Sequence, residues 1–177
     1  MIFPLFRRSP RRATISTLYG MIVAQARLPV LYRDYAVPDT VNGRFDLVVL
    51  HLALVLDRLG QDDRLRSLGQ GVFDRFCRDM DHNLREMGVG DLAVPKEMRR
   101  LGEAFYGRAQ AYRSALAASD ERALVEALRR NIYGGSDTAP ADRLAAYVRE
   151  AVAALEAQSP QDLAAGRLRF PQLGSVR

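Results

Sequence analysis

Apolar residues recur at steps of three and four along most of the chain, and strict alternation of apolar and polar residues is hard to find. This spacing is typical of amphipathic helices. Glycine and proline punctuate it, with Gly60, Gly88 and Gly134 at predicted helix ends and Pro95 and Pro140 at predicted helix starts. We expect helices at about 14–27, 38–60, 62–88, 95–116, 120–134 and 140–155. A connector is expected at 29–35, and a short basic tail after Pro160.

The predicted helix 38–60 is apolar on nearly every face, because the stretch 45–56 (FDLVVLHLALVL) holds few polar residues. A helix that is apolar all round must be surrounded by other helices. Short connections between long helices indicate a bundle. The sequence therefore predicts an all-α fold, a compact bundle of about six helices around this central helix. We expect a basic N-terminal arm at 1–12, one helical domain at 13–158 and a C-terminal tail at 159–177.

The net charge of +5 is concentrated at the N-terminus, where no acidic residue precedes Asp34. The arm contains four arginines: Arg7, Arg8, Arg11 and Arg12. Such an arm can attract an anionic lipid surface or an RNA backbone. The alternative is a solvated basic tail without a partner. Peripheral contact with the inner membrane is thus one expectation for these arginines.

Cysteine content and hydropathy bear on the compartment. Cys77 is the single cysteine, so no intramolecular disulfide can form. No apolar stretch reaches the roughly 18–20 residues of a membrane-spanning helix, and the arginine-containing N-terminus lacks the apolar core of a signal peptide. We expect a soluble protein of the bacterial cytoplasm. A peripheral location at the inner membrane is the alternative expectation.

Catalytic motifs are missing from the sequence. It has neither a phosphate-binding loop ending in Lys-Ser or Lys-Thr nor a Gly-x-Ser-x-Gly elbow, and Gly69-Gln70-Gly71 is too short for a dinucleotide fingerprint. His51 and Cys77 lie on apolar faces and are expected in the core. Asp79, His82 and Glu86 share one helix face, where an ion-paired surface is the simpler interpretation than a metal site. We expect no enzyme activity, no cofactor and no metal.

One long segment and three shorter ones carry a family resemblance. Residues 79–96 (DMDHNLREMGVGDLAVPK), together with 45–51 (FDLVVLH), 105–108 (FYGR) and 130–133 (RNIY), resemble the ubiquinol-cytochrome c chaperone family. The resemblance spans about residues 30–135, and the long segment is its most specific part.

The resemblance implies an all-helical, non-enzymatic assembly factor for ubiquinol-cytochrome c reductase that binds newly made cytochrome b. It also implies that mitochondrial relatives work with a small partner protein near the ribosomal tunnel exit. This chain has little N-terminal extension compared with those relatives. We therefore expect cytochrome b as the client of this chain. Whether it also binds the ribosome and a small partner protein is left open by the resemblance.

A chaperone for a membrane protein needs an apolar surface with polar surroundings. The candidate residues lie in the hairpin formed by the predicted helices 62–88 and 95–116. The apolar candidates are Val89, Leu92, Val94, Met98, Phe105 and Tyr106, and the charged candidates are Arg78, Asp79, Asp81, Arg85, Asp91, Lys96 and Arg99. The alternative is that the apolar set is core packing, that the charged set locks the hairpin through ion pairs and that Asp91 caps the turn.

Two other functions are alternatives to client binding. A ribosome- or RNA-associated binding protein would use the basic arm, but few aromatic residues interleave with its arginines to stack on bases. A metal-dependent enzyme would centre on His82. Binding of cytochrome b is the leading hypothesis.

Overall fold

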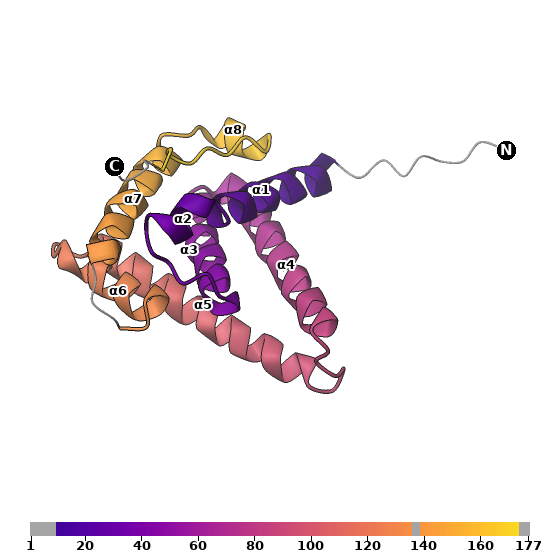
Figure 1. Ribbon diagram of the computed structural model, residues 1–177. Coiled ribbons are helices and arrows are strands. Elements are labelled where there is room, and N and C mark those ends of the chain that lie inside the picture. The colour runs from indigo at the N-terminus through magenta and orange to yellow at the C-terminus, as the bar shows by residue number, and fades with distance from the viewer. Residues whose placement is uncertain (1–9, 136–138, 174–177) are drawn as a thin grey trace.

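The computed structural model describes residues 10–135 and 139–173, and all regular structure in them is helical. The long helices are α1 (Pro10–Ala26), α3 (Val41–Gly60), α4 (Asp63–Glu86), α5 (Val94–Ala117), α6 (Arg122–Ile132) and α7 (Ala139–Glu156). Two helices of five residues, α2 (Pro29–Arg33) and α8 (Pro160–Ala164), complete the described part (Figure 1). The predicted all-α class and the six long helices are confirmed.

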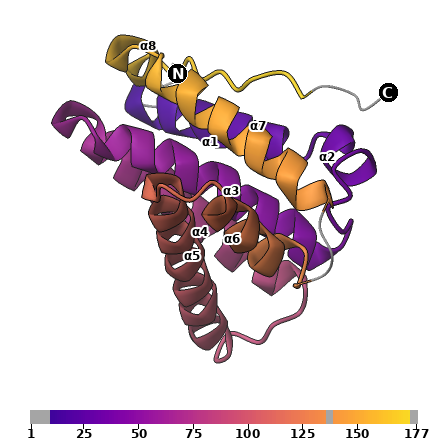
Figure 2. The same ribbon diagram turned by 90° about the vertical axis from the view of Figure 1, so that its left-hand side faces the viewer.

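Helix α3 is the central helix, as predicted. It packs against α1, α4, α5, α6 and α7, and every residue from Asp46 to Val55 is buried. Figure 2 shows α1 and α7 running alongside α3, with α5 crossing it steeply. The hydroxyl of Thr40 accepts a hydrogen bond from the Gly43 amide at 3.1 Å and so caps the start of α3. A Cβ on Gly43 would lie 2.0 Å from the Pro38 carbonyl oxygen, so only glycine fits there.

The two chain ends differ from expectation. Helix α1 begins at Pro10, so Arg11 and Arg12 belong to its first turn and not to an arm, and the Arg11 guanidinium donates to the Ser67 carbonyl at 2.7 Å. Arg7 and Arg8 lie outside the described residues. The segment after Pro160, expected as a basic tail, buries Leu163 and Leu168 almost completely. Its arginines alternate with apolar residues, so one side can pack while the other stays in water.

No helix of the described residues is both long and apolar enough to cross a membrane. Helix α3 is buried along most of its length because five other helices pack against it.

A buried polar network ties α3 to its neighbours. His51 is fully buried, with Nδ1 2.7 Å from the Leu47 carbonyl oxygen and Nε2 2.8 Å from the Tyr147 hydroxyl. A carbonyl only accepts, so Nδ1 carries the proton and Nε2 of the neutral ring accepts from Tyr147. Tyr147 in turn accepts from Gln25 of α1 at 2.9 Å. His51 is thus a core residue, as the sequence predicted.

Acid is expected to destabilise the fold through His51. Burial lowers the pKa of His51 from 6.5 to about 4, so the unfolded chain binds a proton there before the folded chain does. The stabilisation is complete above pH 6.5 and is lost as the pH falls towards 4. Between pH 7 and pH 5 the free energy of unfolding should drop by about 2 kcal/mol. Urea denaturation at the two pH values measures it, and His51→Gln, neutral throughout, should lose most of that drop.

Candidate functional site

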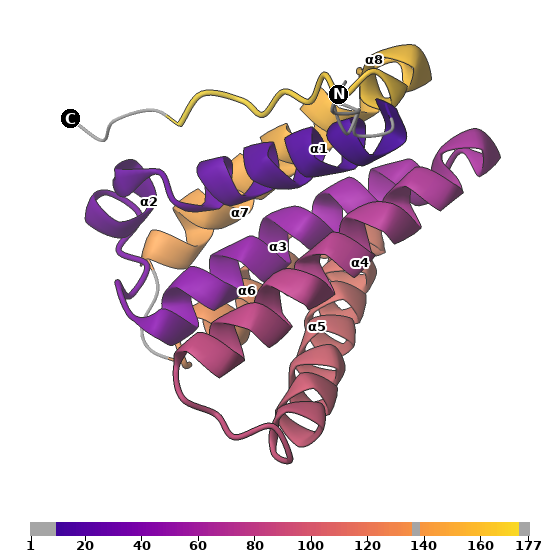
Figure 3. The same ribbon diagram turned by 90° about the vertical axis from the view of Figure 1, so that its right-hand side faces the viewer.

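An apolar groove opens where the start of α3, the end of α4 and the first half of α5 meet. Helices α4 and α5 are joined by the 87–93 turn and cross farther along, where Phe105 of α5 packs on Phe73 and Phe76 of α4 (Figure 3). The groove has a volume of about 580 Å³. Its apolar lining residues are Val41, Phe45 and Val48 from α3, Met80 and Leu84 from α4, Met87 directly after α4, and Leu101 and Ala104 from α5. Two of them extend the apolar surface outward, since Val41 is 71% and Met87 is 61% exposed.

Charged and polar side chains border this groove. Arg27, Arg44, Asn83 and Glu86 line it together with the apolar residues. Arg44 is held by Asp39 at 2.6 Å and lies over the ring of Tyr32. Such a combination of an apolar surface and a polar border is typical of sites that bind peptides or proteins.

An ion pair forms the deepest polar part of the groove. Asp46 of α3 is only 7% exposed, and its Oδ1 lies 2.8 Å from Nη2 of Arg108 on α5. Burial raises the pKa of Asp46, and the charge of Arg108 opposes that rise. The guanidinium of Arg108 also lies 6.0 Å from the centre of the Phe45 ring. The pair therefore crosslinks α3 and α5 under the groove, where a lone carboxylate would be costly.

The six apolar residues predicted from the hairpin do not form one surface. Val94 and Phe105 are buried at 2% and 3% exposure, and Phe105 packs on the rings of Phe73 and Phe76. Leu92 is fully exposed, Tyr106 is 63% exposed, and Val89 and Met98 are half-buried. None of the six lines the groove. Core packing therefore describes Phe105, which belongs to the hydrophobic core, and Val94 is buried at the start of α5.

The charged residues of the hairpin mostly pair with one another. Arg85 bridges Asp81, at 2.8 Å, and Asp91 of the turn, so these three fasten the end of α4 to the turn. Arg99 pairs with Glu103. The side chains of Arg78 and Lys96 are exposed and make no hydrogen bond or ion pair within residues 10–135 and 139–173. Asp91 thus serves the turn through Arg85, as one of the alternatives anticipated.

Asp79 has a different role in the packing. Its carboxylate accepts a hydrogen bond from the buried Tyr19 hydroxyl at 2.8 Å and pairs with Arg75 at 3.7 Å. The Arg75 guanidinium lies 5.7 Å from the centre of the Tyr19 ring. Asp79 therefore holds α1 on α4.

The residues weighed for chemistry occupy ordinary structural positions. His82 and Glu86 form an exposed pair at 3.1 Å, and no group of three potential metal ligands occurs in the part of the chain that is described. Cys77 is half-buried against the core, and burial raises the pKa of its thiol, which disfavours the nucleophilic thiolate. Gly69 and Gly71 lie inside α4, where a Cβ on Gly71 would collide with Ile15 of α1.

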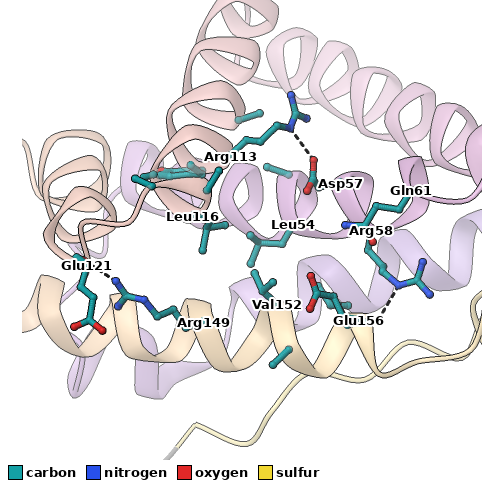
Figure 4. A pocket seen from close by; sticks show the side chains of 18 residues that line it. Leu54, Asp57, Arg58, Gln61, Arg113, Leu116, Glu121, Arg149, Val152 and Glu156 are labelled. Carbon is teal, nitrogen blue, oxygen red and sulfur yellow. Dashed lines mark hydrogen bonds and ion pairs between the residues drawn. The ribbon is translucent and has the colours of Figure 1, made fainter.

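A second hollow lies between α3, α5 and α7 and is shown in Figure 4. Leu54, Leu116 and Val152 point into it, and its three arginines bond to other groups of the protein. Arg113 pairs with Asp57 at 2.7 Å, Arg58 donates to the Leu155 carbonyl at 3.0 Å, and Arg149 donates to the Glu121 carbonyl at 2.5 Å. The first two bonds join α3 to α5 and to α7, and the third fastens α7 to the residue before α6, so the first groove is the stronger candidate site.

The candidate residues predicted from the sequence do not include several residues of the groove, among them Phe45, Asp46, Leu84, Leu101 and Arg108. The sequence does contain a signal for these residues. The segments 45–51, 79–96 and 105–108, which carry the family resemblance, each contribute to the groove lining. Asp46 also stands inside an otherwise apolar helix, where a carboxylate needs a partner.

Comparison with known proteins gives a consistent result. Residues 33–170 match the model of a family described as "Ubiquinol-cytochrome C chaperone". The "Ubiquinol-cytochrome-c reductase complex assembly factor 1" of Xenopus laevis is 26% identical over 149 residues, covering 82% of this chain and 74% of the relative. The Mus musculus protein of that name is 28% identical over 149 residues, covering 82% of this chain, which spans only 50% of that relative's length.

Among solved structures, the crystal structure of the Cbp3 homolog from Brucella abortus matches with a TM-score of 0.85. The two are 41% identical, and the match covers 97% of each chain. The family match includes the three helices that form the groove, and it extends beyond the predicted 30–135 into α7 and α8.

Proposed function

Because the chain belongs to the ubiquinol-cytochrome C chaperone family, we propose that it binds newly made cytochrome b in the α3–α4–α5 groove and thereby assists assembly of ubiquinol-cytochrome c reductase. The groove itself carries this proposal. It is an open, apolar depression, and three of the segments that resemble the family contribute residues to its lining. The names of the relatives as assembly factors for the reductase complex support the same client complex.

The lining of the groove suits a client of this class. Met80 and Met87 are flexible and polarizable, so they adapt to side chains of different shapes. A volume of about 580 Å³ accommodates several side chains from one face of an apolar helix. The client's apolar surface would be kept from water and from other apolar segments while it is held.

The charged residues at the border of the groove constrain the orientation of the bound client segment. Arg27 and Arg44 stand at the α3 side of the groove, and Glu86 stands at the α4 side. We propose that these charges orient the bound segment and that binding takes place on the cytoplasmic side of the inner membrane. The notion of a ribosome- or RNA-binding arm has less support, because Arg11 is engaged with Ser67 on the body of the bundle.

Site-specific photo-crosslinking in cells tests the proposal. A photoreactive phenylalanine analogue at Met87, which is exposed at the groove border, should capture cytochrome b. The matched control is the same analogue at Ser114, which is exposed on α5 and does not line the groove. Capture of cytochrome b at both positions to the same extent, or at neither, would contradict the proposed site.

A further inference from the structure

Exposed apolar side chains gather at the end of the bundle where the groove opens. Within residues 10–135 and 139–173, the large apolar residues with high exposure are Val41, Met87, Leu92 and Tyr106. Val41 and Met87 line the groove, and Met87 and Leu92 belong to the same turn between α4 and α5. Tyr106 lies farther along α5, beside the ring of Phe73. A concentration of exposed apolar residues of this kind marks an interaction surface.

The 87–93 turn protrudes from the rest of the molecule. Figures 1 and 3 show it at the tip where α4 and α5 are joined, far from α8. Leu92 is 100% exposed, so no neighbouring side chain covers it. A rigid protein partner could bury this side chain only in a pocket that fits it, and that contact alone would give a very small interface. Lipid chains are fluid and surround a protruding apolar side chain without such a fit.

The backbone of the turn is already largely hydrogen-bonded within the hairpin. The amides of Met87, Gly88 and Val89 donate to carbonyl oxygens near the end of α4, and the Ala93 amide donates to the Gly90 carbonyl at 2.8 Å. An amide bonded within the chain does not need water as a partner. Moving this turn out of water therefore costs less than moving an open loop would.

The charges around the turn fit the headgroup layer of a membrane. The carboxylate of Asp91, next to Leu92, is paired with Arg85. Lys96 is exposed four residues after Leu92 and can extend its ammonium group towards lipid phosphates. Residues 85–100 carry four basic and three acidic side chains, so attraction to anionic lipid is weak. The apolar residues of the turn must supply most of the affinity for a membrane.

We propose that the 87–93 turn inserts Leu92, together with Met87, into the interface of a phospholipid bilayer and places Lys96 at the level of the phosphates. The groove then opens at the membrane surface, because Met87 belongs both to the turn and to the groove lining. This contact with lipid goes beyond the proposed function and does not require the client. It can therefore fail while the groove remains the client site.

Tryptophan fluorescence of the full chain tests the inference, because the sequence contains no tryptophan. The variant Leu92→Trp is mixed with vesicles of phosphatidylethanolamine and phosphatidylglycerol. The lipid concentration is about 1 mM, at which an anchor as weak as one myristoyl chain is mostly bound. The emission should shift to shorter wavelengths and should be quenched by lipids with brominated acyl chains. Tyr106→Trp, exposed on α5 away from the turn, is the matched control and should show neither change.

Flotation of the same vesicles with the wild-type chain and with Leu92→Asp gives a second measurement. Because the variant replaces an inserted leucine by a charge, its affinity for the vesicles should fall at least about tenfold. Equal flotation of the two chains overturns the inference.

The fluorescence outcomes separate this contact from other routes to the membrane. Unchanged emission of Leu92→Trp overturns the inference even where the chain floats with the vesicles, since another surface then holds it. An equal response of the Tyr106→Trp control overturns it as well. Both changes at position 92 alter a fully exposed side chain, so the bundle should fold in each variant.

Discussion

Replacing Leu84 by glutamate should abolish reductase assembly in a strain that depends on this protein, without unfolding it. Leu84 is half-buried and lines the groove on α4 beside Met80 and Met87. A carboxylate there stays hydrated only while the groove is empty, and an apolar client would have to desolvate it. That penalty amounts to several kcal/mol, which corresponds to a loss of roughly a hundredfold or more in affinity.

The fold should tolerate this change because glutamate is a good helix former and Leu84 already has access to water. The measurement is reductase activity and cytochrome b content in membranes of a deletion strain complemented with each variant. Ser67→Glu is the matched control, since it places the same charge on the exposed face of α4, away from the groove. Normal cytochrome b content with Leu84→Glu would rule out this groove as the client site.

The second large effect is expected from Leu50→Ala in the central helix. Leu50 is fully buried in α3, and its replacement leaves a cavity among the helices that surround it. Such substitutions lower the free energy of unfolding by about 2–5 kcal/mol. For a chain of this size, each kcal/mol lowers the melting temperature by roughly 2–4 °C, so a decrease of about 10 °C is expected. Thermal unfolding followed by circular dichroism measures it.

Leu92→Ala provides the matched comparison for Leu50→Ala. Leu92 is fully exposed at the turn between α4 and α5, so its truncation should change the free energy of unfolding by no more than about 0.5 kcal/mol. Both variants replace leucine by alanine, so comparing them isolates the effect of burial. Similar melting temperatures for the two variants would mean that α3 is not the packed centre of the bundle.

The helices and the central position of α3 could be read from the sequence because both depend on local information. Helix periodicity identifies apolar faces, and glycine and proline mark the ends. Gly60 is the last residue of α3, and Asp62 caps α4 by accepting from the Arg64 amide at 3.0 Å. The enclosure of α3 followed from its composition, since a helix apolar on all faces cannot remain in water.

The functional surface could be predicted from the sequence only in part. Periodicity shows that Phe105 and Leu84 each lie on an apolar face, but Phe105 is buried against aromatic rings and Leu84 lines an open groove. The difference arises because α4 and α5 pack together at Phe73, Phe76 and Phe105 but lie apart nearer the 87–93 turn (Figure 3). Apolar residues near the turn thus find no covering helix, and no local pattern encodes how far two helices separate.

The sequence by itself determined the helical class, the positions of the long helices, the central helix and the family resemblance. Only the tertiary structure paired Asp46 with Arg108 and brought the segments around Phe45, Leu84 and Arg108 to one groove. The physical reason is the range of the interactions. Helix formation and capping act within a few residues, whereas burial and ion pairing between helices depend on how those helices cross.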